Sequence, residues 1–590
     1  MSKKYVLVIA EKPSVAQSIA KVVGAYQRKD GYLEGGGYLV SWCVGHLIGL
    51  ASADQYDIAY RSWAYETLPI FPQEWKYEIN EDRKRQFDLL KKLMNRTDVA
   101  EVVEATDAGW EGELIFRLVY QMAKCRKPVR RLWISSLEED AIKEGLLKAK
   151  DIKAYDTVYE AASCRMQADW LVGINATRLF TSLHKKLLTI GRVQTPTLAM
   201  IVERSDQIAC FHPETYFMVE LVAENGMCMK SSRLKQRQEA EKLAESCEGK
   251  TAEVMSIQRS DETVACPHLY DLTSLQRESN RVYGYTAQQT LTFAQSLYEK
   301  KLITYPRTDN CYLTEDMQET VQTVWKQAVC FCGLQEGELP KPNVTPLIGE
   351  KVSDHHAILP TKQLEQYKAT ALTEEEKKIL YLISLRLICA TMQPYRYLKT
   401  KICLSCAGES FEAKGVQTLV GGWKKIWKQQ IREDNTEQQE FCYELQEGHK
   451  LLVTNATVTD HKTSPPKSFT EDLLLAEMER AGYQDFDKET EKKGIGTPAT
   501  RAAIIEKLIR QKYVERKGKQ LLATKEGTKL IAVVPETLKS AKRTAAWENR
   551  LLAIERGAET RENFLKDIQS ELKDLVRTYA FLADGERKNQ

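Results

Sequence analysis

The chain has 590 residues, 43% hydrophobic and 28% charged, a composition typical of a folded protein rather than a disordered one. Basic residues exceed acidic ones by only three (85 against 82), so the net charge neither requires nor excludes a nucleic acid partner. No apolar run approaches the roughly 20 residues of a membrane helix, and the first residues resemble a strand rather than a signal peptide. We therefore expect a cytoplasmic protein without a membrane span, with about three to five domains by length.

The first 150 residues alternate strands and helices. Residues 5–10 and 99–106 are predicted as short apolar strands, and residues 14–23 and 111–123 as the helices after them. This alternation predicts an α/β domain with a mainly parallel sheet.

Charged residues follow both predicted strands. Glu11 and Lys12 come after the first strand, and Asp107 and Glu111 after the second. Because the loops after parallel strands share one edge of a sheet, we expect the three carboxylates to converge there. Such a cluster suits Mg²⁺, which prefers oxygen ligands. The alternative is a solvated acidic helix start favoured by the helix dipole, and these residues alone do not choose between the two.

The rest of the chain alternates in longer blocks. Residues 155–210 are predicted helical, 211–265 strand-rich, 270–395 helical and 398–459 strand-rich, and the remainder is helical. This order indicates nested domains, in which later segments return to complete earlier ones.

The segment Leu302–Asp309, LITYPRTD, places a tyrosine next to a rigid turn and a cation. It follows an amphipathic helix predicted at residues 287–300, and Pro306 ends that regular structure. A phenol at its usual pKa is a poor nucleophile, so Tyr305 needs a neighbouring cation or base. Arg307 is placed to assist its ionisation and to hold a phosphate. With 26 tyrosines in the chain, packing is the commoner role, and this motif alone does not establish catalysis.

Two later segments carry further polar residues. SDHHAILPT, residues 353–361, holds adjacent histidines that suit either phosphate contact and proton transfer or a structural role. In residues 494–524, Thr497 is a predicted helix cap with Pro498 at the first helical position, followed by a basic hairpin at residues 517–519. A helix and basic hairpin suit DNA phosphates, but also a solvated charged face. The sequence contains no ATP-binding glycine loop, so ATP use is not expected.

Together these segments resemble the type IA DNA topoisomerases, most closely bacterial DNA topoisomerase III, over about residues 3–530. The matching motifs occur in the family's order, which makes the resemblance specific. VIAEKPSVAQSIA and ATDAGWEGELIFR match the Toprim domain, GRVQTPTLAMIVER the DNA groove, YDLTSLQRESN through LITYPRTDNCYL together with DHHAILPT the tyrosine domain, and GIGTPATRA the late helical domain.

The resemblance implies a multi-domain α/β and α+β protein whose Toprim, helical and strand-rich domains form a toroid. The Toprim domain is expected at residues 1–152, and a helical DNA-groove domain at 153–212 and 465–590. A strand-rich arch or hinge domain is expected at 213–268 and 397–464, and a helical domain carrying the active-site tyrosine at 269–396.

The implied activity is ATP-independent relaxation of negative supercoils and decatenation of DNA. Tyr305 would cleave one strand through a 5′-phosphotyrosine, another strand would pass, and the break would be religated. Arg307 and Lys12 match residues on either side of the scissile phosphate, and Glu11 matches the residue that protonates the leaving oxygen. The histidine near the phosphate is matched by His356 or, as the alternative, His355.

The resemblance also implies ligands and partners. Mg²⁺ would be held by Glu11, Asp107 and Glu111. Single-stranded DNA and negatively supercoiled or catenated duplex DNA would be the substrates of a monomer associated with the nucleoid. The residues expected to bind DNA are the family-matched Arg165, Asp169, Arg192, Gln194 and Thr497, together with Arg501 of the basic helix.

The acidic motif departs from the family pattern Asp-x-Asp-Arg-Glu-Gly-Glu at two positions. Gly109 removes one carboxylate, which should weaken Mg²⁺ binding without abolishing it. Trp110 replaces a fixed positive charge with a ring that either stacks on a base or packs beneath the loop. The alternative function is therefore a single-stranded-DNA-binding homologue disabled by Gly109 and Trp110. A Toprim nuclease or primase would need only the first domain, so the later motifs argue against that class.

Overall fold

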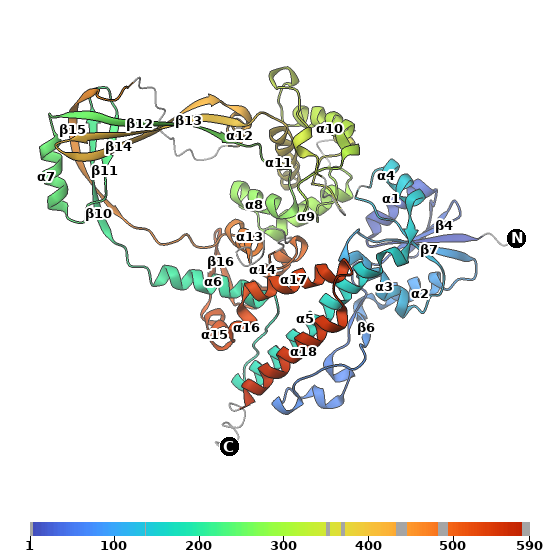
Figure 1. The fold of residues 1–590 in the computed structure, drawn as a ribbon. Coiled ribbons are helices and arrows are strands. Elements are labelled where there is room, and N and C mark those ends of the chain that lie inside the picture. The colour runs from blue at the N-terminus through green and yellow to red at the C-terminus, as the bar shows by residue number, and fades with distance from the viewer. Residues whose placement is uncertain are drawn as a thin grey trace.

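The computed structural model describes residues 4–135, 137–349, 355–366, 372–431, 445–481 and 494–580. Its elements form an arch with the N-terminal sheet at one side and a strand-rich unit at the other (Figure 1). Helices from the middle and the end of the sequence lie between them. The C-terminal helix runs beside a helix that directly follows the N-terminal sheet, so segments far apart in sequence complete the same helical unit.

The N-terminal sheet has the strand order β2-β3-β4-β1-β7-β8-β9. Its centre is parallel, because β1 pairs with β4 and β7, and β7 pairs with β8. The predicted parallel sheet is confirmed there, whereas the antiparallel outer pairs were not predicted. The strands are β1 (Tyr5–Ala10), β2 (Gln27–Lys29), β3 (Tyr32–Gly35), β4 (Tyr38–Trp42), β7 (Val99–Ala105), β8 (Val129–Arg131) and β9 (Lys150–Asp151), and a separate ribbon pairs β5 (Ile48–Leu50) with β6 (Tyr77–Ile79).

The two predicted helices of this domain begin and end within a residue of the prediction, whereas α2 and α4 were not predicted. Helix α1 begins at Pro13, which suits the first helical position because it has no N–H to satisfy there. Helix α3 begins at Trp110, and Gly109 is the residue before it. The helices are α1 (Pro13–Val23), α2 (Lys84–Met94), α3 (Trp110–Met122) and α4 (Glu139–Lys148).

A second unit consists of helices from two distant parts of the chain. Helix α5 packs along α17 and α18, and α6 packs against α14, α15 and α17. Thr497 and Pro498 open α14 as predicted, and a hairpin follows it. The elements are α5 (Asp156–His184), α6 (Gln194–Ala209), α13 (Glu471–Arg480), α14 (Pro498–Arg510), β16 (Val514–Lys517), β17 (Gln520–Ala523), α15 (Lys525–Val533), α16 (Glu536–Lys539), α17 (Ala541–Glu555) and α18 (Arg561–Thr578).

The strand-rich unit is a closed barrel in the order β10-β11-β14-β13-β12-β15, with α7 packed against β10 and β15. The barrel closes through short pairings of β12 with β15 and of β11 with β14, whereas the remaining lengths of β12, β13 and β14 continue as a three-stranded antiparallel ribbon. Its elements are β10 (Thr215–Ala223), β11 (Cys228–Ser231), α7 (Arg237–Cys247), β12 (Thr251–Val264), β13 (Tyr395–Cys406), β14 (Glu409–Val420) and β15 (Lys450–Lys462), and α12 (Gly422–Gln430) follows β14.

The remaining helices carry the LITYPRTD segment. Helix α9 ends at Glu299, close to the predicted end, and the segment with Tyr305 follows it. One hydrophobic core joins this region to the N-terminal sheet, since it includes Val8 and Ala105 together with Ile303 and Tyr305. The tyrosine is therefore packed against the sheet edge. The helices are α8 (Leu272–Tyr283), α9 (Ala287–Glu299), α10 (Gln318–Phe331) and α11 (Glu374–Ala390).

Candidate active site

Tyr305 lies at the carboxyl edge of the N-terminal sheet, where the loops after the strands meet. Its backbone N–H donates to the carbonyl oxygen of Ser135 at 3.1 Å, and its phenol donates to Asp107 Oδ2 at 3.2 Å. Tyr298 packs edge-on against its ring, with centroids 5.4 Å apart. The side chain is 7% exposed, so the phenol is held in one position among protein groups.

The resting Tyr305 is a neutral phenol. Burial raises its pKa well above the usual value, the negative charge of Asp107 raises it further, and Arg307 opposes both. Arg307 therefore lowers the pKa of Tyr305, as expected, but burial and Asp107 raise it by more. A nucleophilic role for this phenol would require a proton acceptor at the moment of attack.

Two predicted carboxylates flank the tyrosine from the sheet side. Glu11 is 3% exposed, and its Oε2 has no hydrogen-bond partner among the described residues. Burial, reinforced by Asp107, raises the pKa of Glu11 to about 8. Glu111 behaves oppositely: its contact with His46 and the charge of Arg307 lower its pKa. The two carboxyl groups therefore differ in protonation, as a site with separate acid and anion roles requires.

Two cations face these carboxylates. Arg307 Nη1 lies 3.4 Å from Glu111 Oε2. Burial alone would lower the pKa of Arg307, but Tyr305 and Glu111 raise it, so the guanidinium is always charged. Lys12 Nζ is 4.0 Å from Glu299 Oε1 at the end of α9, across from the sheet. Both cations are partly exposed and can reach an incoming phosphate.

The structure distinguishes the two adjacent histidines of DHHAILPT, whose first residue lies outside the described part of the chain. The His355 ring is 4.5 Å from the Tyr305 ring, and its Nε2 is 2.5 Å from the carbonyl oxygen of Ala108. Burial lowers the pKa of His355, so the ring is neutral and donates there. His356 Nδ1 instead lies 2.7 Å from the carbonyl oxygen of Ala357. The alternative residue, His355, is the one that contacts the tyrosine, because neighbouring residues of an extended segment point to opposite sides.

No three metal-ligating side chains lie close enough in the described ranges to form a ready-made metal cage. Glu11 nevertheless leaves a buried carboxylate oxygen unpartnered beside Asp107. An orphaned oxygen with a second carboxylate nearby fits a hydrated divalent cation, which needs only one or two protein carboxylates. Gly109 contributes no ligand, and its φ of +140° is a conformation that side-chain-bearing residues rarely adopt.

Arg131 was missed by the sequence reasoning and organises the loop that carries Asp107. It is completely buried at the end of β8. Its guanidinium donates to Glu113 Oε2 at 3.1 Å and to the carbonyl oxygens of Thr106 and Asp107 at 2.8 and 2.9 Å. Glu113, the last acidic residue of the motif, is thus an internal ion-pair partner of Arg131. Arg131 lies at the end of β8, the strand next to β7, and its contact with the loop after β7 cannot be read from the spacing of residues in the sequence.

Three of the predicted DNA-binding residues form an ion network with one unpredicted residue, Glu548. Arg192 donates to Asp169 and to Glu548, each at 2.6 Å, and Arg165 donates to Glu548 at 2.7 Å. Burial would raise the pKa of Glu548, but Arg165 and Arg192 outweigh it and hold the pKa at about 2. Glu548 is 383 residues from Arg165 in sequence, so no local pattern could reveal the pair.

The other predicted DNA-binding residues serve mainly internal contacts in this structure. Gln194 is 5% exposed and donates to the carbonyl oxygen of Thr189, and Thr497 caps α14. Arg501 is 2% exposed and donates to the Ile495 carbonyl oxygen and Thr273 Oγ1. Arg501, Gln194 and Arg192 are thus all buried among protein partners in this structure.

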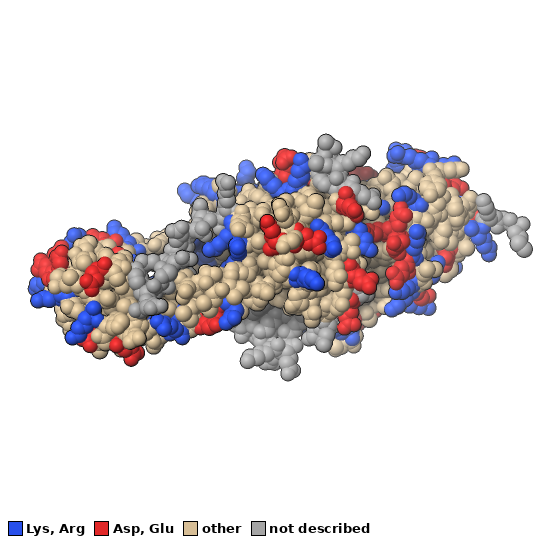
Figure 2. All heavy atoms as spheres, turned by 90° about the horizontal axis from the view of Figure 1, so that it is seen from above, with Lys and Arg blue, Asp and Glu red and all other residues tan. Residues whose placement is uncertain are grey.

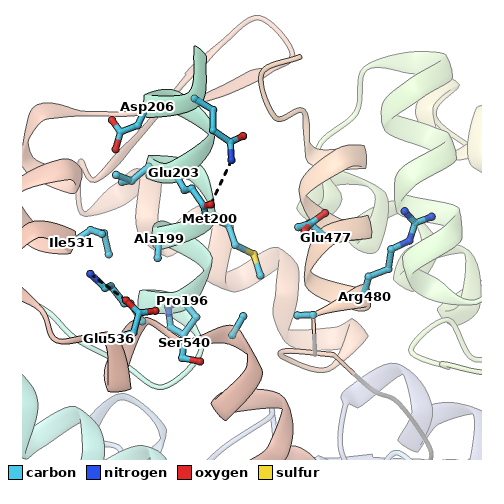
Figure 3. A pocket seen from close by; sticks show the side chains of 15 residues that line it. Pro196, Ala199, Met200, Glu203, Asp206, Glu477, Arg480, Ile531, Glu536 and Ser540 are labelled. Atoms are coloured by element: carbon cyan, nitrogen blue, oxygen red, sulfur yellow. Dashed lines mark hydrogen bonds and ion pairs between the residues drawn. The ribbon is translucent and has the colours of Figure 1, made fainter. Parts of the chain in front are cut away.

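Neither the surface charge seen in Figure 2 nor the cavity described below indicates another site for a nucleic acid. Lysine, arginine, aspartate and glutamate alternate over the face seen in Figure 2, so a phosphate surface must be local. A cavity of about 840 Å³ lies between α6, α13, α15 and the start of α17, away from Tyr305 (Figure 3). Its charged lining is mostly acidic, which disfavours a nucleic acid backbone: Glu203, Asp206, Glu477 and Glu536 against Arg480 and Lys539. Among the described residues, no helix has the length and apolarity needed to cross a bilayer.

Comparison with known proteins gives consistent matches along the chain. The family model described as DNA topoisomerase matches residues 153–566, and that of the Toprim domain, a metal-binding fold, matches residues 6–137. Proteins named DNA topoisomerase 3 from Shouchella clausii and Bacillus subtilis (strain 168) are 39% and 38% identical, over 98% of this chain and 81% and 82% of theirs. The solved full-length topoisomerase I of Thermotoga maritima has the same fold, with a TM-score of 0.75 at 22% identity, over 97% of this chain and 90% of that one.

These matches extend over nearly the whole chain and agree with the order of its motifs. The resemblance drawn from the sequence is therefore confirmed, and the toroidal multi-domain fold class with it. The chain belongs to the type IA DNA topoisomerases, and its similar relatives are DNA topoisomerase 3 enzymes.

Proposed function

We propose that this topoisomerase cleaves a single DNA strand with Tyr305 and reseals it after another strand has passed. The observation that carries the proposal is the hydrogen bond from the Tyr305 phenol to Asp107, formed at a sheet edge between acidic and cationic side chains. A packed structural tyrosine would not require a carboxylate, two cations and a histidine around it. The same site supports the active enzyme over a disabled DNA-binding homologue, since the residues assigned to chemistry are all present.

The reaction exchanges one phosphodiester for another. The Tyr305 oxygen attacks the phosphorus and forms the phosphotyrosine bond while the bond to the 3′ oxygen breaks. Asp107 is the nearest acceptor for the phenol proton. Glu11, buried and with one oxygen unpartnered, supplies a proton to the leaving 3′ oxygen. The reverse transfers religate the strand, and because each step keeps one phosphodiester, no ATP is consumed.

The cations and the histidine hold the reacting groups. Arg307 binds the scissile phosphate through its planar fork, and Lys12 binds it from the α1 side. His355 fixes the Tyr305 ring and ties it to the loop at Ala108. We assign His355, rather than His356, to this position because only its ring lies against that of Tyr305 in the described contacts.

We propose Mg²⁺ as the metal of the Toprim domain; it would be held by Asp107 and Glu111 directly and by Glu11 through water, so that the Glu11 carboxyl keeps the proton that it gives to the 3′ oxygen. When bound, Mg²⁺ would supply positive charge that balances these carboxylates as the DNA phosphate approaches. Hard oxygen ligands and no sulfur or imidazole in the set favour Mg²⁺ over a transition metal.

The partners follow from the same chemistry. We propose that the substrates are single-stranded DNA and negatively supercoiled or catenated duplexes, in which strands separate easily. Arg165, Asp169, Arg192, Gln194 and Thr497 would line the single-strand groove between the two helical segments, residues 153–212 and 465–590. Residues 213–268 and 397–464 would form the hinge. We further propose a monomer that works in the cytoplasm at the nucleoid.

The proposal is tested by relaxation of negatively supercoiled plasmid without ATP. We expect relaxation by the wild type with Mg²⁺, loss of it with EDTA, and at least a thousandfold lower rate for Tyr305→Phe, which removes only the nucleophilic oxygen. Tyr298→Phe is the matched control, because Tyr298 touches the same ring without being the proposed nucleophile. Relaxation that survives in Tyr305→Phe would overturn the tyrosine assignment, and no wild-type activity would favour the disabled homologue.

A further inference from the structure

We propose that Trp110 is a positioning residue that holds Arg165 in place in the single-strand groove. The inference rests on the proposed function only in that Arg165 contacts DNA. In this proposal Gly109 and Trp110 do not disable the site. They connect the loop that carries Asp107, beside Tyr305, to the groove residue Arg165.

The first observation is the stacking of Trp110 on Arg165. The guanidinium carbon of Arg165 lies 4.2 Å from the centroid of the Trp110 ring, well within the range of a cation–π contact. The ring is partly buried and packs against two hydrophobic cores, that of the N-terminal sheet and that of α5 with α17 and α18. Trp110 is therefore wedged between the Toprim domain and the groove helices and cannot easily move away from Arg165.

The second observation is how few other restraints Arg165 has. Arg165 donates to Glu548 at 2.7 Å, a carboxylate that it shares with Arg192, and its Nε has no hydrogen-bond partner among the described residues. One carboxylate serving two guanidinium groups cannot fix both orientations. The Trp110 indole ring packs against the flat face of the Arg165 guanidinium and restrains its orientation. Because the ring is uncharged, it does not neutralise Arg165, which can still bind a phosphate.

The third observation is the backbone before Trp110. Gly109 has φ +140° and ψ 176°, a region that is essentially restricted to glycine, and no heavy atom lies within 4 Å of where its Cβ would be. The glycine is thus required by conformation rather than by space. It directs the chain from Asp107 into α3 so that the first helical residue meets Arg165. The two departures from the family motif therefore act together.

The experiment measures binding of a fluorescent single-stranded oligonucleotide by anisotropy, in EDTA and in the Tyr305→Phe background, where cleavage cannot interfere. Trp110→Leu removes the aromatic face and keeps apolar bulk, and Trp110→Arg places a third cation beside Arg165. We expect both to bind about fivefold more weakly, the size of a partly buried cation–π contact, and Trp110→Phe to restore most of the affinity.

A double-mutant cycle with Arg165→Ala separates positioning from general damage. In that background Trp110→Leu should cause no further loss, because the residue it positions is gone. With Tyr305 present, adduct formation by Trp110→Leu at saturating DNA should stay within about twofold of wild type, so the defect lies in KM and not in kcat. If Trp110→Leu lowers the thermal midpoint, the same measurements are made on Trp110→Met, whose side chain is apolar and similar in volume to leucine.

Two results would overturn the proposal: wild-type affinity in Trp110→Leu, or an equal loss with and without Arg165. Neither depends on Tyr305. Failure of the proposed function appears differently, as absence of a covalent adduct in the wild type or its persistence in Tyr305→Phe.

Discussion

The Tyr305 phenol is a neutral donor at rest, because burial and Asp107 raise its pKa against the opposing charge of Arg307. A nucleophile in this state needs a proton acceptor at the moment of attack. Asp107 is within hydrogen-bond reach, so the position of its loop decides whether the proton can leave. Arg131 fixes that loop through two consecutive carbonyl oxygens, and His355 contacts the next one.

Arg131→Lys should slow cleavage at least tenfold while leaving oligonucleotide affinity within about twofold. Lysine keeps the charge but loses the fork that reaches Glu113 and both loop carbonyls, and small displacements of a catalytic group are costly. Single-turnover adduct formation and anisotropy measure the two quantities. Arg130→Lys, one residue earlier and paired with Glu101 instead, is the control and should be near normal. Equal effects of the two substitutions would contradict the role given to Arg131.

Gly109→Ala and Gly109→Asp should both lose activity at saturating Mg²⁺, although the second restores a carboxylate. Any side chain at φ +140° costs about 1–3 kcal/mol or forces the loop to change, and open space at this position excludes a steric clash as the cause. Thermal midpoints and Mg²⁺ titrations of plasmid relaxation test this. If Gly109→Asp worked at lower Mg²⁺ than wild type with no loss of stability, the glycine would be a defect rather than a requirement.

At the scale of elements, Glu548 joins helix α17 to α5 through Arg165 and to the segment before α6 through Arg192. Glu548 and Arg192 are both buried, so each charge depends on the other for compensation. The late helices therefore cover α5 and also supply a negative charge, Glu548, that compensates the two arginines Arg165 and Arg192.

Glu548→Gln should lower the free energy of unfolding of this helical unit by about 3 kcal/mol near pH 7, from a pKa of about 2 against an ordinary 4.5. Because the folded pKa is depressed, the stabilisation is present above about pH 4.5 and is lost as the pH falls toward 2. The difference between the thermal midpoints of wild type and variant should be largest at pH 7, smaller at pH 3, and nearly gone by pH 2. Glu562→Gln, exposed at the start of α18, is the control. A gap that stays constant with pH would rule out this linkage.

Local features of these elements could be predicted from the sequence, whereas side-chain pairings across the fold could not. Pro13 and Thr497 mark helix starts because capping depends on a few neighbouring residues, and Glu11 and Asp107 could be placed on one edge by the parallel-sheet rule. Glu548 could not be found, since its partner is hundreds of residues away. Arg501 appeared to be a surface cation because a basic helix does not reveal which of its residues points inward.

At the scale of the whole molecule, the contacts that join the N-terminal sheet domain to the helices carrying Tyr305 lie among the proposed catalytic residues. The backbone N–H of Tyr305 meets Ser135, Arg307 meets Glu111, and Lys12 meets Glu299. In the proposed reaction, these contacts must part for strand passage while the phosphotyrosine bond holds the cut strand. Re-forming them brings the 3′ oxygen back for religation.

The most direct test of this account identifies the atom that is linked to DNA. The wild-type chain is incubated with Mg²⁺ and a single-stranded oligonucleotide labelled at either end, denatured with detergent and digested for mass spectrometry. We predict that only the 3′-labelled strand stays attached, through a 5′-phosphate on the peptide that contains Tyr305. Attachment of the 5′-labelled strand, linkage to another residue such as Tyr298, or no covalent product would contradict the central claim.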